Sequence, residues 1–173
     1  RPDVVVFLDA DHSDHPEEME RLLAPIRRDE AELVIGARVP ERRAPGALPL
    51  QARLGNRLAA WLLGRIYGAR CTDLGPFRAV RYEALERLGM RDRGCGWTVE
   101  MQVRAARGGL RAVEVPVSYR RRVGRSKISG TLSGTVRAGC AILWIIARHA
   151  PARGRVAPAR WRRRGRRSAR PRS

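Results

Sequence analysis

Two aspartates placed two residues apart are the strongest chemical signal in this sequence. Asp9 and Asp11 directly follow the apolar run Val4–Leu8, so both carboxylates stand at the end of an expected strand. At this spacing their oxygens can be directed toward one hard cation while Ala10 points elsewhere. A Mg²⁺ or Mn²⁺ ion held in this way keeps open positions for diphosphate oxygens. An isolated Asp-x-Asp is also common as a solvated acidic turn, so the rest of the chain has to decide between the two.

A lone lysine is the second signal. The chain has 36 basic residues, and all of them are arginine except Lys127, which lies in the segment Arg121–Lys127. In such an arginine-biased chain a single lysine indicates a place where a compact ammonium is preferred over a guanidinium. Gly124 lets the backbone turn, and the positive charge can neutralise negative charge that develops on a reacting group. A polar surface loop is the alternative interpretation.

These side chains need a scaffold, and the apolar pattern predicts an α/β domain. The run Val4–Leu8 is typical of a strand buried on both faces of a parallel sheet. A helix is expected to begin near Pro16, and a second strand at Leu33–Gly36, which gives one parallel strand–helix–strand unit. Ligands in such sheets bind at the carboxyl ends of the strands. Further elements are expected at residues 77–80, 82–88, 97–107 and 113–119, the last as a half-exposed strand in which Pro116 favours a sheet edge.

Two more helices are predicted from their apolar residues. The first buries one stripe with steps of three and four, made of Leu50, Leu54, Leu58, Trp61, Leu62 and Ile66. The second spans about 132–147, and its uncharged run at residues 138–147 is well short of the ~20 residues that a membrane-spanning helix needs. This second helix suits either the core or a membrane interface.

The positive charge is concentrated near the C-terminal end. The formal net charge is +19, and ten of the basic residues fall between Arg153 and Arg172 in a Pro/Gly/Ala/Arg-rich stretch. We expect residues 151–173 to be a disordered basic tail, after an α/β portion at residues 1–130 and the apolar helix at residues 131–150. A non-catalytic module that binds nucleic acid or anionic membrane is one reading of this charge. Only 5% of the residues are aromatic, which argues against an RNA-reading surface, and no specific nucleic-acid partner is expected.

A phosphatase is a further alternative for the acidic pair. Haloacid-dehalogenase-type phosphatases also place Asp-x-Asp after an apolar strand, with the first aspartate as nucleophile and the second as acid/base. These enzymes usually need a later acidic pair, and no later Asp-Asp occurs in this sequence. The phosphatase reading is therefore the less favoured one.

Five segments occur in a characteristic order over most of residues 3–135. They are VVVFLDADHSDHPEEM, VIGAR, DLGPFRAVR, GWTVEMQVRAA and YRRRVGRSKISGT. In these segments the chain resembles the family 2 glycosyltransferases of the polyprenyl-phosphate sugar synthase type, related to dolichyl-phosphate mannose synthase. The resemblance implies a partial GT-A domain, a Rossmann-like nucleotide-diphospho-sugar transferase fold that lacks its first strands. We therefore expect an N-terminally truncated fragment that is inactive alone, because the missing part should hold the base and ribose.

The resemblance also implies which residues bind the donor and its phosphates. In the family an Asp-x-Asp motif binds the metal and the donor diphosphate, two basic positions face phosphate groups, and an arginine and a lysine close over the diphosphate. An arginine fork suits phosphate because it can bind two oxygens at once. The matching residues here are, in that order, Asp9 and Asp11, Arg38 and Arg53, and Arg121 and Lys127.

A second group matches the family's acceptor and sugar region. Asp73, Gly75 and Arg78 lie in DLGPFRA, where Gly-Pro departs from the commoner Ser-Gly, and Glu100 and Gln102 lie in WTVEMQ. Asp11, Asp73 and Glu100 are the candidate catalytic residues, and Arg78 and Gln102 are expected on the acceptor side. A buried carboxylate such as Glu100 would suit a pocket.

The implied reaction moves a sugar from a nucleotide-sugar to a polyprenyl phosphate, with Mg²⁺ or Mn²⁺ on the donor diphosphate. A phosphate acceptor is already anionic and needs no strong base, whereas a hydroxyl acceptor would need Glu100 or Asp73 as its base. The expected location is the cytoplasmic side, at the inner face of the cell membrane, with peripheral membrane contact.

Overall fold

A mixed five-stranded sheet forms the centre of the protein in the computed structural model, which describes residues 1–94, 96–124, 132–150 and 161–163. In spatial order the strands are β1 (Val4–Phe7), β3 (Arg78–Arg81), β2 (Leu33–Ala37), β4 (Ala112–Pro116) and β5 (Trp161–Arg163). The helices of the described residues are η1 (Pro16–Glu18), α1 (Met19–Arg27), η2 (Pro40–Arg42), α2 (Leu50–Tyr67), α3 (Tyr82–Leu88), α4 (Trp97–Arg107) and α5 (Leu132–Arg148). The predicted α/β class is confirmed.

The sheet combines a parallel frame with one reversed strand. Strands β1 and β2 both pair antiparallel with β3, so they run parallel to each other, and β4 runs parallel to β2. The predicted parallel unit is therefore present, but β3 is inserted between its two strands. Because β3 is reversed, Arg78 at its start pairs with both Phe7 and Ile35. The segment before β3 consequently reaches the same edge of the sheet as the ends of β1, β2 and β4.

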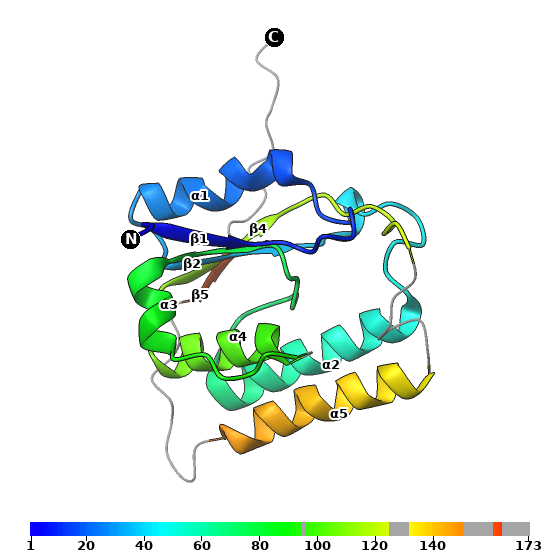
Figure 1. Ribbon diagram of the computed structural model, residues 1–173. Coiled ribbons are helices and arrows are strands. Elements are labelled where there is room, and N and C mark those ends of the chain that lie inside the picture. Colours follow the sequence, from blue (N-terminus) through cyan, green and yellow to red (C-terminus); the bar gives the residue numbers. More distant parts are fainter. Residues whose placement is uncertain (95, 125–131, 151–160, 164–173) are drawn as a thin grey trace.

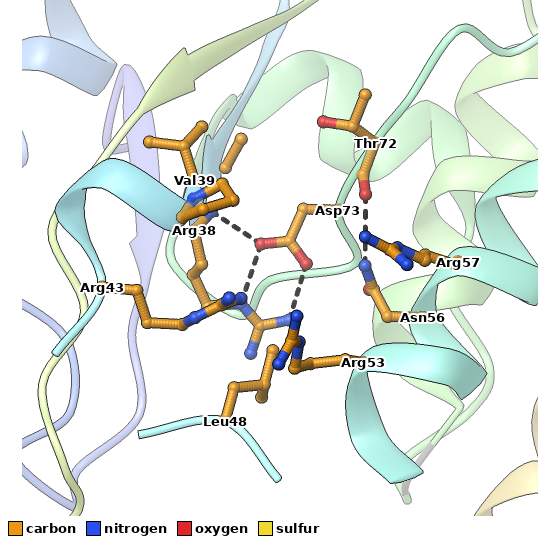
Figure 2. A pocket seen from close by; sticks show the side chains of 11 residues that line it. Arg38, Val39, Arg43, Leu48, Arg53, Asn56, Arg57, Thr72 and Asp73 are labelled. Atoms are coloured by element: carbon orange, nitrogen blue, oxygen red, sulfur yellow. Dashed lines mark hydrogen bonds and ion pairs between the residues drawn. The ribbon is translucent and has the colours of Figure 1, made fainter. Parts of the chain in front are cut away.

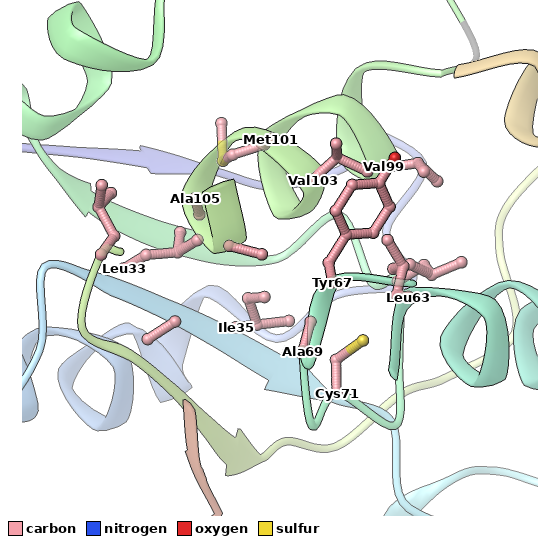
Figure 3. Packing of buried hydrophobic residues seen from close by; sticks show 14 of the residues in the cluster. Leu33, Ile35, Leu63, Tyr67, Ala69, Cys71, Val99, Met101, Val103 and Ala105 are labelled. Carbon is pink, nitrogen blue, oxygen red and sulfur yellow. The ribbon is translucent and has the colours of Figure 1, made fainter. Parts of the chain in front are cut away.

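Helices cover both faces of the sheet, as Figure 1 shows, with α1 on one side and α2, α4 and α5 on the other. Alternate strand residues divide between the two cores. On β2, Val34 packs with Leu22 and Ile26 of α1, while Leu33 and Ile35 face the opposite core. Figure 3 shows this larger core, in which Leu63, Tyr67, Val99, Met101 and Val103 meet the sheet. Burial on both faces gives the sheet edge a rigid base.

Three elements differ from what the sequence predicted: the first strand, the strand that contains Pro116, and the C-terminal segment. The strand β1 is only half buried, since β3 is its one neighbour among the described strands. The strand β4 lies between β2 and β5 instead of at an edge, and Pro116 is tolerated because β5 pairs only with Ala112–Glu114. Within the segment expected to be a disordered tail, Trp161–Arg163 form β5, and its other residues lie outside the described part.

Most of the apolar stripe that was predicted on α2 is exposed instead of buried in the core. Leu50, Leu54, Leu58 and Trp61 are exposed, and the buried residues of this helix are Ala59, Ala60, Leu63 and Tyr67. The prediction of a buried stripe is therefore wrong for its first four members. Among the described residues, no helix combines the length and the apolar character that crossing a bilayer requires.

Candidate active site

Four loops meet at the edge of the sheet that is formed by the strand ends, where β1, β2 and β4 end and β3 begins. The first follows β1 and carries Asp9 and Asp11, and the second follows β2 and carries Arg38. The third precedes β3 and carries Asp73, and the fourth follows β4 as residues 117–124. The reversed strand is the reason the third loop joins the others. Most of the residues singled out from the sequence therefore share one edge, as predicted for an open α/β sheet.

The loop that carries Asp9 and Asp11 is held by its own side chains. The backbone N–H of Asp9 donates to Asp14 Oδ2 at 2.9 Å, and Asp11 Oδ1 accepts the backbone N–H and hydroxyl of Ser13 at 3.0 and 2.5 Å. His12 has a positive φ of 67°, which makes the turn tight. Ser13 and Asp14 are buried beneath the loop. The two motif aspartates are thus fixed by a local network.

The loop after β4 closes onto this acidic loop. The backbone N–H of Arg120 donates to Ser13 O at 3.0 Å, and that of Val123 donates to Asp11 O at 2.9 Å. The Arg120 guanidinium donates to His12 O at 2.6 Å and to Asp14 O at 3.2 Å. Arg122 Nη2 lies 2.7 Å from Asp11 Oδ2. The two loops therefore form one acidic–basic unit.

Arg120 and Arg122, which the sequence reasoning passed over, are the arginines of this loop that contact the acidic loop, and of the two Arg122 contacts the motif itself through Asp11. The predicted clamp residue Arg121 instead donates from Nε to Pro45 O at 2.7 Å. The other predicted clamp residue, Lys127, lies outside the described residues. A run of three arginines gives no sign of which one points at the aspartates, because that depends on the twist of the loop.

The carboxyl groups of Asp9, Asp11 and Asp14 differ in the direction of their pKa shifts. Burial, aided by the charge of Asp11, raises the pKa of Asp9 above its ordinary value. Burial also acts to raise the pKa of Asp11, but the hydrogen bonds from Ser13 and the charge of Arg122 outweigh it and lower that pKa. Burial raises the pKa of Asp14 to about 6. Asp11 is the carboxylate most firmly held in its charged form.

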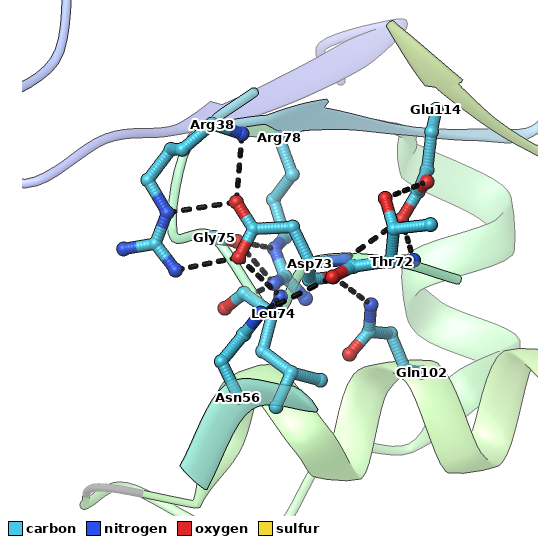
Figure 4. A network of polar contacts seen from close by, with 9 residues as sticks. All are labelled: Arg38, Asn56, Thr72, Asp73, Leu74, Gly75, Arg78, Gln102 and Glu114. Atoms are coloured by element: carbon cyan, nitrogen blue, oxygen red, sulfur yellow. Dashed lines mark hydrogen bonds and ion pairs between the residues drawn. The ribbon is translucent and has the colours of Figure 1, made fainter. Parts of the chain in front are cut away.

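Asp73 is buried and forms a largely buried ion pair with Arg38, whose side chain is 11% exposed, as Figure 4 shows. Asp73 Oδ2 accepts the backbone N–H and Nε–H of Arg38 at 2.7 and 2.8 Å, and Oδ1 accepts Nη2–H at 2.7 Å. The guanidinium also lies over the Tyr119 ring, 5.1 Å from its centroid. Burial would raise the pKa of Asp73, but Arg38 outweighs it and lowers that pKa. Arg38 was expected to face phosphate. Its Nε–H and one Nη2–H are instead used in the hydrogen bonds to Asp73.

A basic pocket opens beside this ion pair, and Figure 2 shows its lining. Arg43, Arg53 and Arg57 surround it together with Asn56, and Asp73 is its one acidic lining residue. The predicted phosphate-binding residue Arg53 is therefore at a cavity. The volume is about 210 Å³, below the range of pockets that enclose whole drug-sized ligands. A phosphate group fits such a pocket better than a complete nucleotide-sugar.

Arg78 is completely buried, and its guanidinium forms hydrogen bonds with backbone carbonyls. Its guanidinium donates to the carbonyls of Leu74, Gly75 and Thr98 and lies over the Trp97 ring, 5.0 Å from its centroid. Burial lowers the pKa of this arginine to about 9. Arg78 therefore holds the turn at residues 74–75 in place. Its expected acceptor-side role stays a prediction.

Gly75, the first residue of the Gly-Pro departure, lies tightly against the backbone of β2. A Cβ on Gly75 would lie 2.8 Å from the carbonyl oxygen of Gly36, at the end of β2. Gln102 supports the same segment by donating to Asp73 O at 2.9 Å. Glu114, which sequence reasoning missed, accepts the backbone N–H groups of Thr72 and Asp73 at 2.7 and 3.1 Å. A glutamate within an apolar strand was the available signal.

Glu100 is buried, as predicted, but its carboxylate caps a loop. It accepts the backbone N–H groups of Arg91 and Asp92 at 3.0 and 2.7 Å and forms an ion pair of 2.7 Å with Arg104. Burial would raise the pKa of Glu100, but these contacts outweigh it and lower the pKa. The described contacts tie Glu100 to residues 91–104, and its catalytic role stays a prediction.

The sequence profile of "Glycosyl transferase family 2" matches residues 1–89, about half of the chain. The chain belongs to glycosyl transferase family 2. It is 39% identical over 134 residues to an uncharacterized glycosyltransferase of Mycobacterium tuberculosis, covering 77% of this chain and 60% of the relative. It is 36% identical over 157 residues to the undecaprenyl-phosphate mannosyltransferase of Micrococcus luteus, covering 82% and 62% respectively.

A further relative of this chain is the polyprenol monophosphomannose synthase of Mycolicibacterium smegmatis. The two are 35% identical over 136 residues, which cover 74% of this chain and 50% of the relative. The chain thus spans about 50–62% of the length of these curated relatives. The family assignment confirms the expected partial GT-A fold, and it favours neither the phosphatase nor the non-catalytic alternative.

The two charged regions give this edge of the sheet complementary chemistry. Asp9 and Asp11 offer carboxylate oxygens, which are suitable ligands for a hard divalent cation. The described residues contain no group of three or more His, Cys, Asp or Glu side chains that could hold a metal ion. Arg43, Arg53 and Arg57 offer guanidinium groups at the basic pocket. The same edge can therefore attract both a metal and phosphate oxygens.

Proposed function

We propose that this glycosyltransferase transfers a sugar from a nucleotide-sugar to a polyprenyl phosphate. The observation that carries the proposal is the juxtaposition of Asp9 and Asp11 with an arginine-lined pocket at one sheet edge. A diphosphate donor and a phosphate acceptor are both anionic, and this edge supplies a partner for each. Relatives named as an undecaprenyl-phosphate mannosyltransferase and a polyprenol monophosphomannose synthase support this choice.

Asp9 and Asp11 would hold Mg²⁺ or Mn²⁺, which when bound supplies positive charge to the donor diphosphate. Arg122 already balances Asp11 and stands where it can turn to phosphate oxygens. Arg121 and Lys127 belong to the same basic segment, and we propose that they close over the diphosphate. Neutralising the leaving group's charge lowers the barrier to its departure.

Arg53 and Arg57 would bind the acceptor phosphate in the basic pocket. A phosphate monoester oxygen is anionic near neutral pH, so it attacks the sugar without a strong general base. Asp73 keeps Arg38 in place, and Arg78 and Gln102 hold the Asp73 segment. In this proposal they position the acceptor side. Glu100 supports the fold beside it or, with a hydroxyl acceptor, acts as a base.

The location that follows is the inner face of the cell membrane, where a lipid phosphate is accessible from the cytoplasm. Nucleotide-sugar on that side and acceptor in the bilayer would meet at the edge of the sheet. Peripheral contact is sufficient for this purpose.

Binding is the primary test, because the chain spans only 50–62% of the relatives' length. Isothermal titration with inorganic pyrophosphate and Mn²⁺ should show metal-dependent binding that Asp9→Asn and Asp11→Asn each weaken at least about tenfold. Asp3→Asn, on the exposed stretch before β1, is the matched control. Pyrophosphate binding that needs no metal, or that survives both motif substitutions, would overturn the donor assignment.

Acceptor binding is tested with labelled polyprenyl phosphate in detergent, since the chain alone is expected to be inactive in transfer. We expect Arg53→Gln with Arg57→Gln to weaken the binding of polyprenyl phosphate while leaving Mn²⁺–pyrophosphate binding unchanged. Equal loss of both would mean that the basic pocket belongs to the donor.

A further inference from the structure

A second cavity lies at the opposite end of the sheet from the candidate active site. Helix α4 packs against α3 and α5, and the last turns of these helices surround the cavity (Figure 1). Its lining includes Arg87, Leu88, Arg104, Arg107, Leu110 and His149. Leu110 stands just before β4 begins, and the five residues of β4 span about 16 Å to the active edge. This cavity, called the α3–α5 pocket below, is therefore separate from the site described above.

The α3–α5 pocket is large enough for a small organic molecule. Its volume is about 470 Å³, more than twice the 210 Å³ of the basic pocket at the active edge and within the range of ligand-binding pockets. Leu88 and Leu110 are buried and give the pocket an apolar wall. Arg87 and Arg107 are exposed, so a ligand can reach the pocket from solvent.

The polar side chains of the α3–α5 pocket select for an anion. Three guanidinium groups and one imidazole line it, and no acidic side chain is among the described residues of the lining. Guanidinium groups form their strongest hydrogen bonds with phosphate and carboxylate oxygens. Basic residues in the last turn of a helix are also ordinary, because they offset the negative end of the helix dipole. The contacts of each arginine decide between these two roles.

The end of α4 does not need Arg107 as a cap. The backbone N–H groups of residues 108–110 donate to carbonyl oxygens of the last turn at 2.8, 3.3 and 3.0 Å, with Gly109 at a positive φ of 65°. The chain thus closes this helix end with its own backbone. The Arg107 guanidinium forms no hydrogen bond or ion pair with the described part of the chain. Its charge is therefore available to a ligand.

The other two arginines are held in place by carboxylates outside the lining. Arg87 Nη2 lies 2.6 Å from Glu32 Oε1, and Arg104 Nε lies 2.7 Å from Glu100 Oε1. Arg104 Nη1 also donates to Leu88 O at 3.0 Å. A guanidinium has five N–H donors, so both arginines keep donors beyond these contacts. Because their carboxylate partners already fix them, a ligand would lose little affinity by ordering these side chains.

Phosphate suits this arrangement better than a carboxylate does. A phosphate ester has three terminal oxygens that can accept from several guanidinium groups at once, whereas a carboxylate has two. His149 Nδ1 lies 3.0 Å from Ile145 O, a carbonyl oxygen that can only accept, so Nδ1 carries the proton and Nε2 is left for a ligand. Nε2 can accept from a protonated phosphate oxygen, or donate when the imidazole is charged.

We propose that the α3–α5 pocket binds a small soluble phosphate ester. The phosphate lies at Arg87, Arg104 and Arg107, and the organic part lies against Leu88 and Leu110. The proposal goes beyond the proposed function, because the α3–α5 pocket shares no lining residue with the basic pocket and contains neither aspartate of the acidic motif.

Nuclear magnetic resonance of the full ¹⁵N-labelled chain tests the pocket, since backbone amides report binding residue by residue. Inorganic phosphate and glycerol 3-phosphate are titrated separately, without Mn²⁺ or pyrophosphate, and each is compared with sodium chloride at equal ionic strength. We expect both to shift the amides of Gly108, Gly109 and Leu110 with half-saturation at or below about 10 mM. Glycerol alone should leave these amides unshifted.

Arg107→Gln should raise the Kd of both phosphates at least about tenfold, because it removes charge-assisted hydrogen bonds. Arg65→Gln is the matched control, since Arg65 is also an exposed arginine in the last turn of a helix but lies outside the pocket. It should bind like the wild type. Circular dichroism and thermal melting establish that each variant is folded.

Three results would overturn the proposal. The first is a set of amide shifts that sodium chloride reproduces, which would mean charge screening alone. The second is Arg107→Gln binding phosphate as tightly as Arg65→Gln does. The third is a chain that binds inorganic phosphate but excludes glycerol 3-phosphate, since the pocket would then not hold an ester.

The pocket and the proposed function fail separately. Asp11→Asn, and Arg53→Gln with Arg57→Gln, should leave the shifts at residues 108–110 unchanged. Arg107→Gln should in turn keep the Mn²⁺-dependent binding of pyrophosphate, and any pyrophosphate held by the α3–α5 pocket is recognised by its loss in this variant.

Discussion

Arg122 Nη2 lies 2.7 Å from Asp11 Oδ2, so a positive charge from the loop after β4 faces the carboxylate of the acidic motif. Asp11 is also the motif carboxylate whose pKa is lowered. The guanidinium stands where a divalent cation bound by the same oxygen would carry its charge. The protein therefore supplies its own counter-ion to the motif, and a metal ion bound at Asp11, as proposed above, would have to compete with it.

Replacing Arg122 with glutamine should strengthen divalent metal binding in the absence of donor. The free carboxylate loses its internal partner, and because both side chains are partly exposed the gain should be modest, about three- to tenfold in Mn²⁺ affinity. Titration of free Mn²⁺ by electron paramagnetic resonance measures this directly. Arg121→Gln is the control, since Arg121 donates to Pro45 O. Unchanged or weaker Mn²⁺ binding by Arg122→Gln would contradict the competition.

Removing the carboxylate of the buried Asp73–Arg38 pair should destabilise the protein strongly. Asp73→Asn leaves the Arg38 guanidinium buried without its counter-ion, for which a loss of about 3–5 kcal/mol in the free energy of unfolding is expected. Urea denaturation measures the change. Asp3→Asn removes an exposed carboxylate and should change stability by less than about 0.5 kcal/mol. A loss for Asp73→Asn no larger than that would mean the pair is not needed for folding.

The frame of this domain was predictable because it depends on short-range apolar patterns. Helices α3 and α4 begin and end where the sequence predicts, and the strand ends at Asp9 and Arg38 were found from the apolar runs before them. The reversed strand β3 was not predicted, since its pairing depends on contacts between distant segments. That strand brings Asp73 to Arg38, which explains why the ion pair was not foreseen.

The orientation of side chains was less predictable than the elements. Helical periodicity locates a stripe such as Leu54 and Leu58 but does not tell whether the stripe faces the core or the outside of the protein. The prediction that it faces the core was wrong. Likewise, neighbouring arginines such as Arg121 and Arg122 are equivalent in sequence, and only the fold separates them.

Gly75 should tolerate no side chain, because a Cβ there would lie 2.8 Å from the backbone oxygen of Gly36. Gly75→Ala should therefore lower the free energy of unfolding by about 1–3 kcal/mol, since backbone has to move. Gly55→Ala is the matched control, as a Cβ on this α2 residue meets nothing within 4 Å. The control should be stabilised by about 0.5–1 kcal/mol through its better helix propensity. Equal effects of the two substitutions on urea denaturation would contradict the steric reason.

Stability should fall as the pH rises through the range where Asp14 titrates. Burial raises the pKa of Asp14 from 3.8 to about 6, so an unfolded chain loses this proton before the folded one. The contribution of the protonated form is complete below pH 3.8 and is lost as the pH rises through about 6, with a cost of at most ~3 kcal/mol.

Asp14→Asn carries no charge and escapes this cost. Its amide must still leave one polar atom without a described partner at the place of Asp14 Oδ1. The variant should therefore exceed the wild type by about 1–2 kcal/mol at pH 8 and match it near pH 4 in urea denaturation with a chelator present. A stability difference that stays constant between these two pH values would show that the pKa of Asp14 is the same in the folded and the unfolded chain.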